Sequence, residues 1–516
     1  MKNNITVDRF KQFYKGIIIE HSAYIVVSKG GQVLSISAES YPVSESFSII
    51  PLQNTDVSMR KALDFVQARK YAWEVLEEDK KRYAGNAIAL QRLEEMRKLH
   101  LPKAELVIAK DVYGDGQAHL AYKFDVYSVE PVSRYKIYVD ALTGKVLLSD
   151  AVIKHVKEGK SKEELDPLNK LANYQYYGLI PDKFIPKSGS PASTTTSELG
   201  TALTRYSGTR QIYTTKVIVP VTGKPDPNNP RVLLTYSGVD PRQPIASDTV
   251  WILKDQTRGK GIETYDMNGA GGVPLSLPEL QAQSLAFVDT DNNWKDEADQ
   301  GAVTKDDLIR GATSNGTNGG NEAFNDDIAI DAHWGAEMVY DYWNKRHSRA
   351  SFDNQNAAIK SYIHYGPAYD NAFWNGSSMT YGDGSGTATA NAANPGFRPL
   401  VSLDVCGHEI GHGVCSFTSD LVYASESGAM NEGLSDIWAA AVENYVDDSV
   451  KLSATPTYQY WQVGENISPD NIGLRRMDNP KAKSDPDTYG GRYWANPNCV
   501  PSDVNDQCGV HTNSGV

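Results

Sequence analysis

Long apolar segments are absent from this chain of 516 residues. No apolar run approaches the ~20 residues that a membrane-spanning helix needs, so we expect no membrane anchor. The first ten residues, MKNNITVDRF, also lack the apolar core of an export signal. Either such a signal has been removed or replaced, or the protein stays in the cytoplasm.

Basic charge is scarce in the larger part of the chain. Residues 1–200 contain 28 Lys and Arg against 25 Asp and Glu, whereas residues 201–516 contain 23 against 39. Phosphate binding needs clustered Lys and Arg, so the acidic part argues against nucleic acid as a partner. Carboxylates suit calcium sites, although a solvated acidic surface explains the charge equally well.

Cysteine is rare, with four residues in all. Cys499 and Cys508 flank a short loop, and we predict a disulfide between them if the protein is extracellular. Cys406 and Cys415 lie on one predicted helix, on opposite faces and about 13 Å apart along its axis. They cannot bridge each other, and we predict that both are buried thiols.

The chain is long enough for about three folded units, and its patterns predict an α+β fold. Short alternating strands occupy 1–50, with a hairpin turn at Lys29–Gln32. A second unit over 51–185 has predicted helices at 58–83 and 87–99, followed by strands at 104–110, 119–128, 134–140 and 146–148. Linker composition marks 186–204, after which 205–400 is mainly strand-like with a helix at 328–347, and 401–516 is helical, with helices at 400–418 and 429–446.

The strongest motif is His408-Glu409-Ile410-Gly411-His412. His-Glu-x-x-His on a helix places two imidazoles on one face, one turn apart, so that both can bind one metal ion. Glu409 lies beside them, where it can act as a general base. These residues predict a catalytic zinc site.

A catalytic zinc needs a third protein ligand. A histidine six residues after His412 is excluded because Thr418 occupies that position, and Cys415 stands where that pattern needs glycine. Glu432 and Asp436 instead share a face of the next predicted helix. Glu432 can bind the metal, and Asp436 can accept the free ring N–H of a zinc-bound histidine.

Several further segments resemble the thermolysin-like metallopeptidases. They include DNAFWNGSSMTYGDG (370–384), LVYASESGAMNE (421–432), LRRM (474–477) and GVHTNSG (509–515). Residues 1–150 also resemble the propeptide modules of this family, a fungalysin/thermolysin-type motif followed by a PepSY-like module. The resemblance implies a monomeric, secreted zinc endopeptidase, made as a zymogen that its own propeptide inhibits and helps to fold. Its zinc would lie in the cleft between a β-rich lobe and a helical lobe.

The resemblance also implies roles for individual residues. His511 and Tyr423 would donate hydrogen bonds to the oxyanion that forms during peptide hydrolysis, and Asp506 would orient His511. Protein or peptide substrates would be held along their backbone by Asn371, Ala372 and Arg475. An apolar pocket would accept the residue after the scissile bond, and its lining would include Val405, Val463 and Leu474.

Calcium ligands are implied at two places. Asp404, Glu443 and Glu465 match one family site, and Asp289 and Asp291 match a smaller one. Two carboxylates of the first site are replaced here by Tyr460 and Gln462, so we predict one calcium ion there and at most one more at the second site.

Family members continue with several helices after the position of His511, so the resemblance implies an incomplete C-terminal lobe. Two alternatives remain open: an inactive metal-binding adhesion module, and a chain whose functional part is the prosegment, acting as a protease inhibitor or chaperone. The presence of Glu409 favours the enzyme, because a structural zinc needs no general base.

Overall fold

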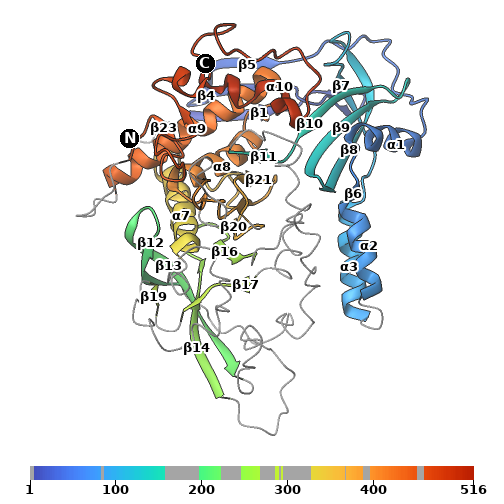
Figure 1. Cartoon of the computed structure of the whole chain (residues 1–516). Coiled ribbons are helices and arrows are strands. Elements are labelled where there is room, and N and C mark those ends of the chain that lie inside the picture. The colour runs from blue at the N-terminus through green and yellow to red at the C-terminus, as the bar shows by residue number, and fades with distance from the viewer. Residues whose placement is uncertain are drawn as a thin grey trace.

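The computed structural model has the predicted α+β fold (Figure 1). The residues that it describes are 5–82, 87–156, 197–221, 246–267, 285–289, 292–294, 327–366, 368–386, 396–449 and 458–516. Within these ranges no helix is both long and apolar enough to cross a membrane.

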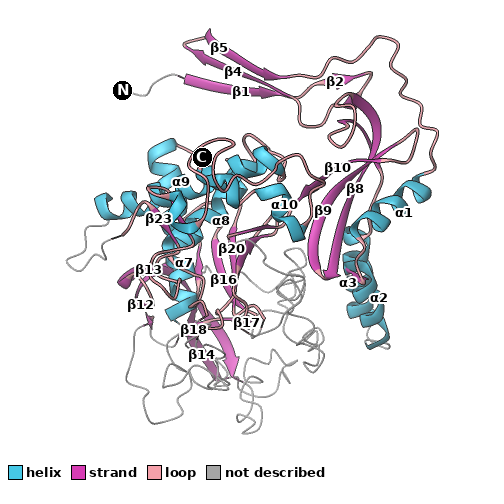
Figure 2. Ribbon diagram, turned by 45° about the horizontal axis from the view of Figure 1, so that its top comes forward, coloured by secondary structure: helices cyan, strands magenta, loops and turns pink. Residues whose placement is uncertain are grey.

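The N-terminal sheet stands at the edge of the molecule (Figure 2). It contains β1 (Ile5–Phe10), β4 (Ala23–Lys29) and β5 (Gln32–Glu39), and it is followed in space by the short pair β2 (Phe13–Tyr14) and β3 (Ile17–Ile18). The predicted hairpin is confirmed, since Lys29 pairs with Gln32. Gly30 and Gly31 have φ values of 58° and 82°, a left-handed conformation that glycine adopts without strain.

The second predicted unit, which begins at residue 51, packs helices against an antiparallel sheet. Its helices are α1 (Thr55–Val66), α2 (Ala72–Arg82) and α3 (Ala87–His100). Among the described residues its strands run in the order β10 (Val146–Ala151), β9 (Val132–Asp140), β8 (Ala118–Glu130) and β6 (Lys70–Tyr71), and β7 (Glu105–Lys110) also pairs with β8. The strands predicted at 104–110, 119–128, 134–140 and 146–148 are therefore confirmed.

The single helix predicted over 58–83 is wrong. α1 ends at Gln67, whose φ of 53° is left-handed and whose N–H bonds to the carbonyl of Leu63. The chain then forms β6, which pairs with β8 before α2 begins. α1 and α2 both have the apolar spacing of a helix, so the sequence pattern looks continuous. The break between them arises because β6 pairs with β8.

Two sheets build the part of the molecule that follows. One has the order β18 (Val288–Asp289), β14 (Ala246–Ile252), β13 (Gly208–Val221), β12 (Ser197–Thr204) and β19 (Asn293–Trp294). The other has the order β11 (Lys154–His155), β21 (Ala372–Trp374), β22 (Met379–Tyr381), β20 (Ile359–Ile363), β16 (Ile262–Asp266) and β15 (Lys254–Asp255), with β17 (Leu285–Ala286) beside β16. Of the predicted linker, 186–196 lie outside the described residues and 197–204 form β12.

The long helices predicted from the sequence are present as α7 (Asp327–His347), α8 (Leu403–Ser416) and α9 (Ser425–Ser449). After them come the short pair β23 (Gln462–Val463) and β24 (Arg475–Arg476), and the short helical segments η3 (Pro480–Lys483), η4 (Asp503–Asn505), α10 (Asp506–Gly509) and η5 (Thr512–Gly515). The predicted Cys499–Cys508 disulfide is confirmed, as are the buried free thiols of Cys406 and Cys415.

The N-terminal region, residues 5–156, shares its apolar cores with the rest of the chain. The cluster around Phe124 and Ile137 of its sheet also contains Tyr423 and Val510. A second cluster joins Ile153 with Phe373 of β21. Burial of apolar surface contributes ~25 cal/mol per Å². These shared clusters therefore stabilise the packing of the N-terminal region against the rest of the chain.

Candidate active site

Close packing of α8 on α9 brings the metal-binding motif to its partners. Two glycines of α8, one turn apart, face α9: a Cβ on Gly407 would lie 2.9 Å from Ala439 Cα, and one on Gly411 would lie 3.2 Å from Ser435 Cα. Larger residues would therefore push the two helices apart. The glycines stand directly before the two motif histidines, which this close approach sets against α9.

Three predicted ligands converge in the buried core between these helices. Glu432 of α9 lies 3.3 Å from His408 Nε2 and 3.2 Å from His412 Nε2. All three side chains are buried, and their ligand atoms lie within 4.8 Å of one another. Neither Nε2 atom has a hydrogen-bond partner among the described residues. Buried polar atoms are normally satisfied, so this donor set fits a zinc ion.

Both imidazoles are oriented through their other ring nitrogen. His408 Nδ1 lies 2.7 Å from Asp436 Oδ1, the predicted partner. His412 Nδ1 lies 2.8 Å from Asn431 Oδ1 and 3.2 Å from Ser435 Oγ. These two residues were not predicted. Their signal is a second polar pair at i and i+4 on α9, adjacent to the pair formed by Glu432 and Asp436.

Glu409 follows His408 on α8 and is fully buried. Neither of its carboxylate oxygens has a hydrogen-bond partner among the described residues. Burial, assisted by the negative charge of Glu432, raises the pKa of Glu409 to about 8, against the opposing charge of His408. A carboxyl group with a raised pKa beside a metal-ligand cluster has the properties of a general acid and base.

The predicted oxyanion donors meet at the same place. Tyr423 Oη donates a short hydrogen bond to Glu432 and lies 3.4 Å from His511 Nε2. Asp506 accepts the backbone N–H of His511 at 2.9 Å and forms a short hydrogen bond with its Nδ1. Although burial opposes ionisation, Glu432 and Asp506 raise the pKa of His511 to about 10, which favours a protonated, donating imidazole.

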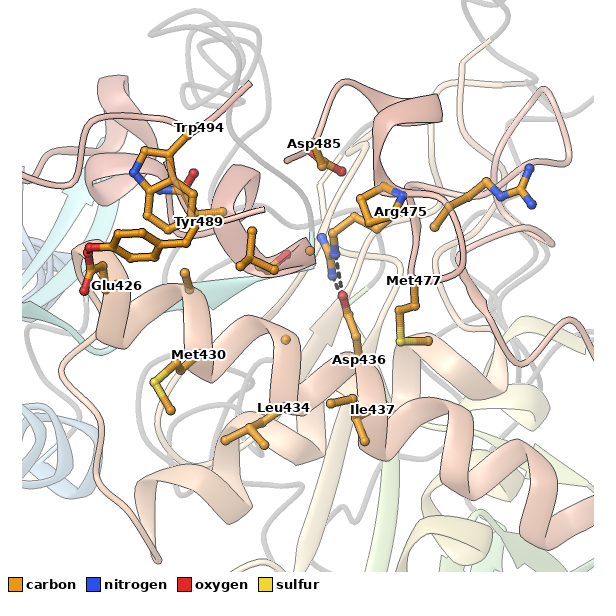
Figure 3. Close-up of a pocket in the computed structure, with 18 of the residues that line it drawn as sticks. Glu426, Met430, Leu434, Asp436, Ile437, Arg475, Met477, Asp485, Tyr489 and Trp494 are labelled. Atoms are coloured by element: carbon orange, nitrogen blue, oxygen red, sulfur yellow. Dashed lines mark hydrogen bonds and ion pairs between the residues drawn. The ribbon is translucent and has the colours of Figure 1, made fainter. Parts of the chain in front are cut away.

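Arg475 links the predicted substrate-binding residues to the metal-ligand cluster. Its Nε and Nη2 each donate to Asp436 at 2.7 Å (Figure 3). The other predicted residues of this group are buried or partly buried, and Val463 pairs with Arg475. Val405 and Val463 are fully buried, Leu474 packs against the main apolar cluster, and Asn371 and Ala372 open β21.

β11, from the N-terminal region of the chain, contacts this site, which the sequence did not predict. β11 pairs with β21 in antiparallel register, with Lys154 opposite Trp374 and His155 opposite Phe373 (Figure 1). The carbonyl of His155 lies 2.7 Å from His511 Nε2, and that of Val156 accepts from Arg475 Nη1 at 2.6 Å. The predicted substrate-binding groups therefore contact the chain's own backbone.

The first predicted calcium site is a compact cluster. The carboxylates of Asp404, Glu443 and Glu465 come within 4.8 Å of one another and are buried. Burial, followed by the charge of Asp404, raises the pKa of Glu443 well above its usual range. Asp447, one turn along α9, adds to this effect and was not predicted. Its Oδ2 accepts a short hydrogen bond from the Tyr460 hydroxyl.

The second predicted calcium site is only partly described. Asp289 is buried in β18 and its Oδ1 accepts a short hydrogen bond from the N–H of Asn292. Asp291 lies outside the described residues.

A separate pocket of about 530 Å³ adjoins the Arg475–Asp436 pair (Figure 3). Met430, Leu434 and Ile437 of α9 line it together with Trp461 and Met477. The two histidines of the motif and Glu432 do not line it. It is therefore distinct from the buried metal-ligand cluster.

Comparisons with known proteins match this chain to a family of metallopeptidases. The family model for the thermolysin metallopeptidase catalytic domain matches residues 236–416, and that for the thermolysin metallopeptidase alpha-helical domain matches 419–516. Thermolysin of Bacillus sp. (strain EA1) is 30% identical over 524 residues, covering 99% of this chain and 69% of that protein. Bacillolysin of Brevibacillus brevis is 39% identical over 272 residues, covering 52% of this chain and 38% of its own length. Among solved structures, the precursor of protealysin from Serratia proteamaculans matches with a TM-score of 0.33 and 24% identity, over 49% of this chain and 65% of that one.

Proposed function

Because the chain belongs to the thermolysin family of metallopeptidases, we propose that it is the proenzyme of a secreted zinc endopeptidase. The observation that carries this proposal is the convergence of His408, His412 and Glu432 beside Glu409, with ligand atoms that lack hydrogen-bond partners among the described residues. A buried set of this kind is costly without a cation. Substrates would be proteins or peptides, and we propose that the enzyme is a monomer.

In the proposed mechanism, His408, His412 and Glu432 hold the zinc. When bound, zinc supplies Lewis-acid polarisation of the substrate carbonyl. Glu409 accepts a proton from the attacking water and delivers it to the leaving amine nitrogen.

The remaining residues either bind the substrate or orient the residues that do so. His511 and Tyr423 donate to the oxyanion, each such donor being worth about 10²–10³ in rate. Asp506 keeps His511 in the donating orientation. Asp436 orients His408 and holds Arg475, which binds the carbonyl of the residue after the scissile bond.

An apolar preference for the residue after the scissile bond follows from the contact between Arg475 and Val156 in this chain. Val156 provides the bound carbonyl, and its side chain is fully buried in the same apolar cluster as Val405. Leu474 packs against that cluster. A charged side chain placed there would lose its hydration without gaining a partner.

The prosegment would act as an intramolecular inhibitor. Substrate needs the edge of β21 and the Arg475 guanidinium, and β11 with Val156 already binds both. Asp150 accepts the backbone N–H of Tyr423 at 2.9 Å, so the prosegment also contacts the segment between α8 and α9 that carries a proposed oxyanion donor. Substrate and prosegment therefore compete for the same groups.

We also propose one calcium ion at Asp404, Glu443 and Glu465. Both Glu443 oxygens are buried without a hydrogen-bond partner among the described residues, and carboxylate oxygens are the ligands that calcium prefers. A further, weaker site at Asp289 and Asp291 stays a prediction from the resemblance.

The test is a pair of substitutions with a matched control. Glu409→Gln should keep one zinc per chain and lower casein hydrolysis by at least ~10²-fold, whereas His412→Ala should lose the zinc as well. Glu426→Gln, on the exposed start of α9, should change neither. Full hydrolysis by the Glu409→Gln protein would contradict the mechanism, and a chain that binds zinc but cleaves nothing would favour a structural metal-binding module.

A further inference from the structure

Resting on the proposed function, we propose that the peptide bond between His155 and Val156 is the first bond that the enzyme cuts in its own chain. The bond lies well before the linker at 186–204, where composition predicts processing. Cleavage would therefore occur in two places, and the first is set by docking in the active site and not by linker exposure.

The backbone contacts bracket this bond. On its N-terminal side, the His155 carbonyl lies 2.7 Å from His511 Nε2, the predicted oxyanion donor. On its C-terminal side, the Val156 N–H donates to the Ala372 carbonyl at 3.2 Å, and the Val156 carbonyl accepts from Arg475 at 2.6 Å. The predicted catalytic and binding groups thus flank one particular amide.

The side chains on either side of the bond also have partners. Val156 is fully buried in the main apolar cluster. The His155 ring packs edge-on against Phe373, with their centroids 5.6 Å apart. Lys154 is almost fully buried, donates to Ser416 Oγ at 2.9 Å, and lies 5.6 Å from the centre of the Tyr423 ring. The lysine thereby anchors the strand on the enzyme.

Neighbouring registers are unfavourable. A slip by one residue would turn every side chain of β11 to the opposite face. It would also bring either His155 or Lys157 to the buried position that Val156 occupies. A slip by two would bring Lys154 or Glu158 there, and burying an unpaired charge costs several kcal/mol. Val156 is the one apolar residue within two positions on either side.

The proposed step is a simple hydrolysis. Water adds its hydroxyl to the His155 carbonyl carbon, the C–N bond breaks, and the Val156 nitrogen takes up the proton that Glu409 delivers. The products are a fragment 1–155 with a new carboxylate and a fragment that begins with an amino group on Val156. A second cut would follow in the predicted linker ahead of β12, which begins at Ser197.

The experiment follows processing of the full chain. The protein is purified with a chelator, zinc and calcium are added, and the fragments are identified by intact mass and N-terminal sequencing. The first new N-terminus should read VKEGKSKE, and its rate of appearance should not depend on protein concentration. A first cut at any other bond, with casein hydrolysis intact, would overturn this inference while leaving the proposed function in place.

A substitution tests the register directly. Val156→Asp should slow the cut at this bond by about 10²-fold or more, because a mismatch of one methylene in an apolar pocket is already worth about 10–200-fold. Val33→Asp, on the exposed face of β5 where the valine is 58% exposed, should process at the original rate. Equal rates for the two variants would contradict the assignment.

A second measurement needs no activity of the enzyme. In the Glu409→Gln chain, trypsin should cut after the buried Lys154 at least ~10-fold more slowly than after the exposed Lys29, since cutting requires local opening. Adding Val156→Asp should remove that protection, and adding Val33→Asp should not. If Lys154 is cut as fast as Lys29 in the unsubstituted background, β11 is not docked and the inference fails, whether or not the chain is a peptidase.

Discussion

Asp436 is the most informative residue to change, because it contacts both a proposed zinc ligand, His408, and a proposed substrate-binding residue, Arg475. Its carboxylate accepts three hydrogen bonds at 2.7 Å, one from His408 Nδ1 and two from the Arg475 guanidinium. Asp436→Asn keeps the size of the side chain and removes its charge. The substitution therefore tests the electrostatic link with little change in packing.

Two magnitudes follow from these contacts. Loss of a carboxylate behind a zinc-binding histidine typically lowers metal affinity by about 10–100-fold, which is ~1.4–2.7 kcal/mol. Breaking a buried ion pair costs about 3–5 kcal/mol. Here Arg475 keeps a second carboxylate, Glu432, at 3.6 Å, so we expect a loss of unfolding free energy near the lower limit, ~3 kcal/mol.

The assay is zinc competition against a chelating dye, combined with urea unfolding of the zinc-saturated protein. Asp448→Asn is the matched control, since it makes the same change on the same helix at a side chain that is 65% exposed. A zinc Kd within about twofold of the original, together with unchanged unfolding, would refute the link between Asp436, His408 and Arg475.

Two further predictions concern stability. Glu443→Gln should abolish most of the protection by calcium, which at 100 times its Kd is worth ~2.7 kcal/mol; calorimetry with and without calcium measures this, and full protection in the variant would argue against the proposed site. Burial raises the pKa of Asp331 to about 8, so the folded state holds a proton that the unfolded state releases near pH 4. Stability should therefore fall by about 1.4 kcal/mol per pH unit between roughly pH 4 and 8 through this group. Asp331→Asn should flatten that slope in urea unfolding at pH 5 and 7.5, and an unchanged slope would contradict the assignment.

Local spacing predicted the parts of the site that lie on single helices. His408 and His412, one turn apart on α8, converge on Glu432 as the motif indicates. Asp436 lies one turn beyond Glu432 and contacts His408. Such pairs are predictable because helix geometry fixes which residues share a face. Asn431 and Ser435 obey the same spacing, and a reading of both polar pairs on α9 would have found them.

The spacing of apolar residues failed to predict the structure of 58–83, because one long helix and two helices separated by a strand have the same pattern. Residues 58–83 carry a continuous helical stripe, yet the chain turns at Gln67 and Lys70–Tyr71 join a sheet. Tyr71 pairs with Ser128, which is 57 residues away in the sequence. Periodicity records which face of a segment is apolar, and it contains no information about a distant strand that competes for the backbone.

The calcium cluster shows a related limit. The replacement of two family carboxylates by Tyr460 and Gln462 suggested a site poorer in negative charge. In the fold, however, Asp447 of α9 approaches the same cluster, and its charge acts on Glu443. It holds the Tyr460 hydroxyl, so the residue that replaces a carboxylate is bonded to another one. Comparison of the 460–465 segment position by position cannot detect a charge that α9 brings to the same cluster.

The docking of β11 depends on a property of the fold that only three dimensions reveal. In the seven-stranded sheet, β21 has β22 on one side and β11 on the other. Without β11 its outer edge would present unpaired N–H and C=O groups, which readily pair with another extended chain. The same edge, at Ala372, is where the family resemblance expects the substrate backbone. β11 satisfies this edge as an extended strand, and the carbonyls of His155 and Val156 then contact His511 and Arg475. The proposed inhibition and the proposed presentation of the His155–Val156 bond would both result from this one pairing, so a substitution that frees the edge should weaken both together.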